Sequence, residues 1–230
     1  MEWLEDSRAC LAVAETMLVE IEGMIQQSIR DESVTPYIKV KIKNCLENCR
    51  SPLDYVANYV FDHYCIMEYT AKELKKFKVY YPISPSEHIF NIAIKEKYKS
   101  LTTKRSDIVK VFEDSQSFKG DIWLKHLPKL INENKHRNLT QQSKEQTTTI
   151  HSGQIGGMTF NNVSMINVKT PFMIGNMPIN FIDPSPYDHL FDASVKLEYY
   201  FQDIGLSVIP TLKAIHHGAT IVINEMERII

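Results

Sequence analysis

Cysteine is scarce in this chain of 230 residues, and its four copies all fall in the first third. Cys10, Cys45, Cys49 and Cys65 each lie in or beside an apolar helical stripe, which favours reduced, buried thiols over a disulfide framework. No run of about 18 apolar residues occurs, and the opening MEWLEDSR is acidic where a secretory signal would be basic and then apolar. We therefore expect a cytoplasmic protein that does not bind a membrane.

The spacings of common metal and cofactor sites are missing as well. Zinc sites use patterns such as CxxC or HExxH, which neither FDHYC (61–65) nor AIHHG (214–218) contains. SGQIGG (152–157) lacks the lysine and the strand-loop-helix context of a phosphate-binding loop. We expect no metal and no cofactor, and these patterns alone predict no catalytic centre.

Two long helices are predicted near the start of the sequence. Residues 3–29 repeat apolar side chains every three, four or seven positions, which indicates one amphipathic helix. After the link RDESVTP, with Thr35 as N-cap and Pro36 at the first helical position, the apolar rhythm runs unbroken through Pro52. A continuous, kinked helix explains this unbroken phase better than two separate helices do, although Ser51 and Pro52 also fit the N-cap and first position of a new helix.

Shorter elements are predicted next. KFKVYYPI (76–83) is typical of an extended segment, and SPSE (84–87) is typical of a capping box, with Ser84 as N-cap, that opens a helix to about Tyr98. Residues 106–113 and 123–134 have helical periodicity. From Thr147 short β-type runs alternate with Gly and Asn, and IGNM (174–177) fits a two-residue hairpin turn.

The last helix, from near Ser207, carries an apolar stripe long enough to need a partner of matching length, and the first two helices provide one. The expected fold class is α+β: a long antiparallel helical hairpin packed with the C-terminal helix, with short helices and a small antiparallel β-sheet inserted between them. We predict one domain, with the hairpin in 1–70, short helices in 71–140, the β region in 141–203 and the returning helix in 207–230.

Positive charge is concentrated in the middle of the chain. Residues 71–110 hold 10 Lys and Arg against 4 Asp and Glu, whereas residues 1–70 hold 6 against 12. Lys75, Lys76 and Lys78 alternate with aromatic residues in KKFKVYY (75–81), a mixture that phosphate contacts and base stacking use. Two interpretations stay open: a binding site for a polyanion such as RNA, and a solvated face that pairs with the acidic N-terminal helices.

Two further clusters are candidate binding sites. Arg50, Asp54 and Asn58 are spaced by four and share one helix face, either as an intrahelical salt bridge or as part of a site. Lys135, His136 and Arg137 come at the end of a predicted helix. They either complement the partial negative charge of that helix end or bind an acidic partner, phosphate or the acidic N-terminal helices.

The same two clusters carry a family resemblance. CRSPLDYVANYVF (49–61) and LPKLINENKHRNL (127–139) resemble an Arg-Ser-x-Leu-Asp signature and an Asp-Lys-His-Arg signature of bacterial proteins that are themselves similar to the HEPN helical superfamily. Pro52 and Asn134 depart from the commonest pattern. The matching positions are Arg50, Ser51, Leu53, Asp54, Lys135, His136 and Arg137.

The resemblance implies a helical, dimer-forming protein of a bacterial or phage conflict system, in which many members bind or cleave RNA. Active members have an arginine followed four to six residues later by a histidine, and no arginine of this chain has one there. We therefore expect an interaction or regulatory module with a protein partner or a second copy. The alternative is a metal-independent ribonuclease, with His136 as general acid or base and Arg50 and Arg137 stabilising the transition-state charge.

Overall fold

The computed structural model describes residues 1–136, 142–168, 172–174, 177–179, 181–182 and 186–230, and of residues 133–136, 174, 178 and 188 the backbone alone. The described chain forms two compact units. Unit 1 is Met1–Glu20, Lys39–Thr140 and Ile209–Ile230, and unit 2 is Ile21–Ile38 and Gln141–Val208. The single-domain expectation stays a prediction, because compactness does not show whether a unit folds by itself.

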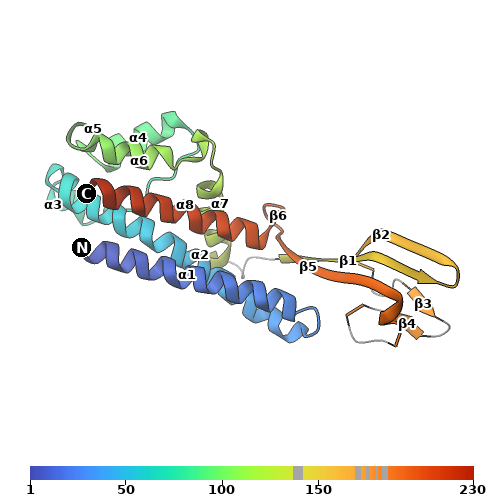
Figure 1. Cartoon of the computed structure of the whole chain (residues 1–230). Helices are drawn as coiled ribbons and strands as arrows, with labels where there is room; N and C mark the ends of the chain where they lie inside the picture. Colours follow the sequence, from blue (N-terminus) through green and yellow to red (C-terminus); the bar gives the residue numbers. More distant parts are fainter. Residues whose placement is uncertain (137–141, 169–171, 175–176, 180, 183–185) are drawn as a thin grey trace. The chain divides into compact units, whose positions relative to one another are not determined.

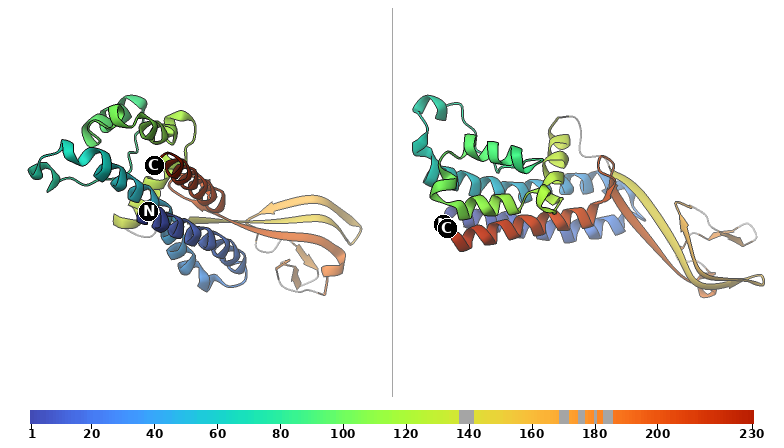
Figure 2. Two further views of the ribbon diagram at one scale, coloured as in Figure 1. Left: turned by 60° about the vertical axis from the view of Figure 1, so that its left-hand side comes forward. Right: turned by 90° about the horizontal axis from the view of Figure 1, so that it is seen from above.

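Three long helices, α1 (Glu2–Gln27), α2 (Thr35–Val60) and α8 (Val208–Ile229), lie side by side over the parts of them that belong to unit 1, as Figures 1 and 2 show. Arg8 of α1 donates to Glu227 of α8 at 2.6 Å, which holds the two chain ends together. His216 Nε2 lies 3.1 Å from the Leu11 carbonyl, so the same pair of helices also meets at mid-length. The expected hairpin with a returning C-terminal helix is confirmed.

Helix α2 runs through Pro52 without interruption and continues into a π-helical turn, η2 (Phe61–Cys65), and a 3-10 turn, η3 (Ile66–Glu68). The prediction of Thr35 as N-cap is wrong. A 3-10 turn, η1 (Glu32–Val34), precedes α2, and its cap is Asp31, whose carboxylate accepts a hydrogen bond from the Ser33 N–H. Thr35 itself has helical dihedral angles, φ −55° and ψ −43°.

The short helices of unit 1 include the three that were predicted, at 87–97, 106–114 and 123–136, and further short elements that were not. They are α3 (Ala71–Leu74), α4 (Glu87–Lys97), α5 (Leu101–Lys104), α6 (Ser106–Asp114), the 3-10 turn η4 (Ser117–Lys119) and α7 (Trp123–His136). The capping prediction for α4 is wrong, since Ser86 is the N-cap. The N–H of Ser84 instead donates to the buried Gln116 side chain at 2.9 Å. The segment 77–84 has no regular secondary structure and joins no strand among the described residues, so its extended conformation stays a prediction.

Unit 2 contains the sheet and the tip of the helical hairpin. The strands are β1 (Gln142–Ile155), β2 (Met158–Ile166), β3 (Phe172–Ile174), β4 (Met177–Ile179), β5 (Phe191–Phe201) and β6 (Leu206–Ser207), with a 3-10 turn, η5 (Asp188–Leu190), before β5. One antiparallel sheet has the order β2-β1-β5-β6, and β3 pairs with β4. Ser28 and Tyr199 join the hairpin tip to this sheet through hydroxyl oxygens 3.0 Å apart.

The α+β fold class is confirmed. Strand β1 begins at Gln142, inside the predicted β region of 141–203 and five positions before the β-type run at Thr147, because QSKEQ pairs with Leu197–Phe201 of β5. Ile174 pairs with Met177, as a two-residue hairpin requires, while the turn residues 175–176 lie outside the described residues. Among the helices described, none combines the length and hydropathy needed to cross a membrane.

Candidate functional site

Arg50 and Asp54 form a two-pronged ion pair on α2. Arg50 Nε and Nη2 each donate to a different Asp54 carboxylate oxygen at 2.9 Å, and the side chains are 15% and 24% exposed. The same carboxylate accepts the N–H of Tyr81 at 2.9 Å. Both Asp54 oxygens therefore already have protein donors, so the pair anchors the segment 77–84 to α2.

A buried hydrogen-bond network fixes the other side of that segment. The Tyr81 hydroxyl lies 2.8 Å from Ser115 Oγ, and the Gln116 amide donates to the carbonyls of Pro82 and Phe112 at 2.8 Å. Burial raises the pKa of Tyr81 well above its ordinary value, a shift that Arg50 opposes only in part. These hydrogen bonds join the segment 77–84 to Ser115 and Gln116 after α6, so the network has a structural role.

Asn58, the third member of the predicted Arg50 cluster, is directed elsewhere. Its amide donates to the Asp54 backbone carbonyl at 2.7 Å, so it adds nothing to the ion pair. It lines a hollow of about 440 Å³ with Phe61, Phe77 and Lys78. Lys75 and Lys76 are exposed and are close in sequence to Lys78 of this hollow. Asn58 is therefore part of the surface of the predicted lysines rather than of the Arg50 ion pair.

The Lys-His-Arg triplet is the half of the candidate site that stays a prediction. Arg137 lies outside the described residues, and Lys135 and His136 are described only as backbone at the end of α7. The helix-terminus interpretation therefore remains a prediction from the sequence, and so does the ribonuclease site of His136 with Arg50 and Arg137. Within the described ranges, no group of three His, Cys, Asp or Glu side chains could hold a metal ion.

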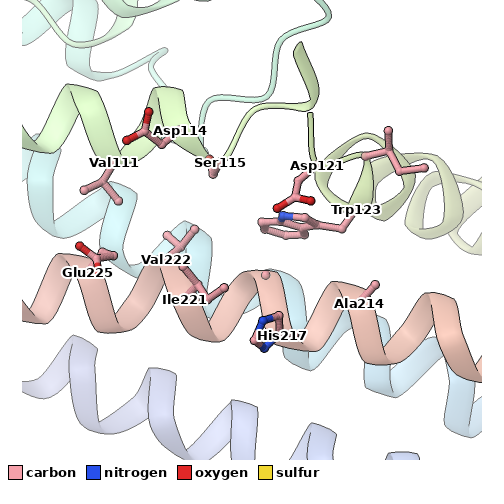
Figure 3. A pocket seen from close by; sticks show the side chains of 12 residues that line it. Val111, Asp114, Ser115, Asp121, Trp123, Ala214, His217, Ile221, Val222 and Glu225 are labelled. Atoms are coloured by element: carbon pink, nitrogen blue, oxygen red, sulfur yellow. The ribbon is translucent and has the colours of Figure 1, made fainter. Parts of the chain in front are cut away.

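A groove that the sequence did not reveal lies between α6, the start of α7 and α8, all in unit 1 (Figure 3). It has a volume of about 580 Å³. One face of α8 forms one wall, α6 and the residues before α7 the other. Its lining is Val111, Asp114, Ser115, Asp121, Ile122, Trp123, Ala214, His217, Gly218, Ile221, Val222 and Glu225.

Gly218 determines how closely α7 approaches α8. A Cβ atom at this position would lie 2.2 Å from Cε2 of Trp123, so only glycine lets the indole ring lie against the helix. Trp123 is 7% exposed as a result. A glycine inside a helix costs about 1 kcal/mol relative to alanine. An interior glycine in the last helix was therefore the only sign in the sequence that α8 has a close neighbour at this position.

The groove combines exposed apolar side chains with negative charge. Ile122 is 56% exposed and Ile221 47% exposed. Asp114, Asp121 and Glu225 also line it, and none of the described lining residues is a lysine or arginine. Asp114 pairs with Lys110 and Glu225 with Arg228, but each of these cations is 72% exposed, so water screens both pairs strongly. The arrangement is suited to a ligand that is apolar on one side and cationic at its edges.

No family model, no curated protein and no solved structure matches this chain. The candidate site therefore rests on its own geometry.

Proposed function

We propose that this chain is a protein-interaction module that binds a cationic amphipathic helix of a partner in the groove between α6, α7 and α8. The observation that carries the proposal is the coincidence of two exposed isoleucines, Ile122 and Ile221, with three carboxylates, two of them in exposed ion pairs, and with no lysine or arginine in the described lining. Apolar anchors provide affinity for a helix laid into a groove, and opposite charge at the edges selects it.

The size of the groove fits this kind of ligand. Its α8 wall runs from Ala214 to Glu225, eleven steps along the helix and so about 16 Å. That length corresponds to about three turns of a partner helix, which would present apolar residues at intervals of three and four. A regulatory role in a bacterial or phage conflict system belongs to this proposal and depends on the family resemblance alone.

Selection from a peptide display library tests the groove. The selection compares the wild-type chain with a double variant that carries Ile221→Ser and Asp121→Lys. We expect the peptides that bind the wild type but not the double variant to be amphipathic and net positive. For individual selected peptides, fluorescence polarisation should show at least about tenfold weaker binding by each single variant, which is a modest change in binding free energy.

Ile89→Ser is the matched control, because Ile89 is 46% exposed and lies on α4 outside the groove. This variant should bind the selected peptides as the wild type does. Selected peptides that are neutral or acidic, or that bind the double variant equally well, would contradict the proposal, and so would a selection that retains no peptide specific to the wild type.

The exposed lysines favour a second candidate function, binding of single-stranded RNA. Three cations of this region already form ion pairs: Lys99 with Glu73, Lys104 with Glu68, and Arg105 with Asp107. In contrast, no described acidic residue forms an ion pair with any of Lys72, Lys75, Lys76, Lys78, Lys95 and Lys97. Tyr80, beside the hollow, is 55% exposed and available for base stacking.

For this second function we expect an oligouridine probe to bind with a steep salt dependence, measured by fluorescence anisotropy between about 50 and 200 mM salt. Replacing Lys75, Lys76 and Lys78 by glutamine should abolish binding, whereas the same change at Lys110, Lys125 and Lys196 should weaken it much less. Equal losses in the two triple variants would contradict a site at KKFKVYY. RNA cleavage that is lost in His136→Ala would instead support the ribonuclease alternative.

A further inference from the structure

Strand β2 forms one edge of the four-stranded sheet in unit 2. It pairs with β1 along its whole length, from Met158 opposite Ile155 to Ile166 opposite Thr147, and no described strand pairs with its outer side. Seven of its nine residues are exposed. Alternate residues of an edge strand direct both N–H and C=O outward, so β2 offers a row of donors and acceptors to another strand.

The features that usually prevent such an edge from pairing are missing from β2. Its sequence, MTFNNVSMI, has no charged residue, no proline and no glycine. Met158 is 61% exposed and Ile166 57% exposed. By comparison, β5 carries Asp192, Lys196 and Glu198. Natural edge strands are typically protected by lysine, proline or short length, so an uncharged edge of nine residues indicates a strand that is covered in the working state.

A left-handed residue in the middle of β2 limits which strand can pair with its outer side. Asn162 has a φ of +51° and lies unpaired between two regular pairs, Val163 with Ile150 and Asn161 with Ser152. A straight peptide strand would lose register at this point. An antiparallel strand could keep register with β2 if it had the same irregularity opposite Asn162. A second β2, related to the first by a two-fold axis at Asn162, places its own Asn162 at that position.

We propose that the chain forms a two-fold dimer in which β2 of each copy pairs antiparallel with β2 of the other, with the two Asn162 residues facing each other. Met158 of one copy then lies opposite Ile166 of the other, so exposed apolar side chains cover each other. Because β2 is uncharged, self-pairing brings no like charges together. This interface lies in unit 2 and is independent of the groove in unit 1.

Asn162→Asp is the test, followed by sedimentation velocity over a range of protein concentrations. Aspartate is nearly the same size as asparagine and also tolerates positive φ, so the fold should be kept. Two carboxylates would then face each other across the two-fold axis, and we expect the dimer dissociation constant to rise at least about tenfold at neutral pH. Acidification to about pH 3 should reverse part of this loss, because the aspartates become protonated.

Asn167→Asp is the matched control. Asn167 also has a positive φ, +57°, and its side-chain oxygen accepts the Gln146 N–H, which a carboxylate would do as well. It lies beyond the end of β2 and does not face its own copy, so this variant should dimerise like the wild type. A monomeric wild type at all concentrations, an assembly larger than a dimer, or an equal effect of the two substitutions would each overturn the proposal.

Discussion

Gln116→Leu is expected to lower the free energy of unfolding by about 3 kcal/mol, since buried polar groups left without partners cost about 1–3 kcal/mol each. The Gln116 side chain is fully buried and makes hydrogen bonds to three backbone groups, the Ser84 N–H and the carbonyls of Pro82 and Phe112. Leucine fills a similar volume but makes no hydrogen bond, so the Ser84 N–H and the Pro82 carbonyl lose this partner, whereas the Phe112 carbonyl keeps the Ser115 hydroxyl at 2.8 Å. Urea denaturation followed by circular dichroism should show a lower midpoint with an unchanged slope.

Gln26→Leu is the control for this measurement. Gln26 is exposed on α1, and its replacement should change the unfolding free energy by less than about 0.5 kcal/mol. A Gln116→Leu protein as stable as the Gln26→Leu protein would show that the Ser84 N–H and the Pro82 carbonyl find other partners, and that the network does not fix the segment 77–84.

Gly218→Ala is expected to destabilise the chain by about 2 kcal/mol, although alanine is the better helix former. The new Cβ would lie 2.2 Å from Trp123 Cε2, so the indole ring must move away from α8. In a Trp3→Phe background, Trp123 is the one remaining tryptophan, since the sequence has two. Its fluorescence emission should shift to longer wavelength as water reaches the ring.

Gly23→Ala is the matched control, because it makes the same change in a long helix with nothing within 4 Å of the new Cβ. Here the propensity gain is unopposed, and stability should rise by about 0.5–1 kcal/mol. Opposite signs for the two substitutions would confirm close packing of α7 on α8. A Gly218→Ala protein that is stabilised, with unchanged emission, would contradict it.

The long helices could be predicted because their information is local. Apolar residues at intervals of three and four specify a buried stripe, and the stripe kept its phase through Pro52, so one helix was the simpler solution. The cap at Ser84 was wrong for a non-local reason. Its backbone N–H is bound by Gln116, 32 residues away in sequence, and the cap moved to Ser86.

The candidate site was predicted only in part. The spacing of four between Arg50 and Asp54 correctly placed them on one helix face, where they pair. The spacing could not show that the Tyr81 N–H would use the same carboxylate, because that contact joins positions 27 residues apart. Asn58 shares the spacing but bonds its own helix backbone, as short polar side chains often do.

The helical bundle and the returning last helix could be read from the sequence because both depend on an apolar repeat of three to four residues. The antiparallel β region could be read from short β-type runs separated by Gly and Asn and from the hairpin turn at IGNM. Which polar groups have partners and which surfaces stay open depends on the tertiary structure. The groove needs Gly218, Trp123 and Asp121 to meet from different elements, and the open edge of β2 depends on strand order. Neither arrangement leaves a periodic pattern along the chain, because each is a relation between distant positions.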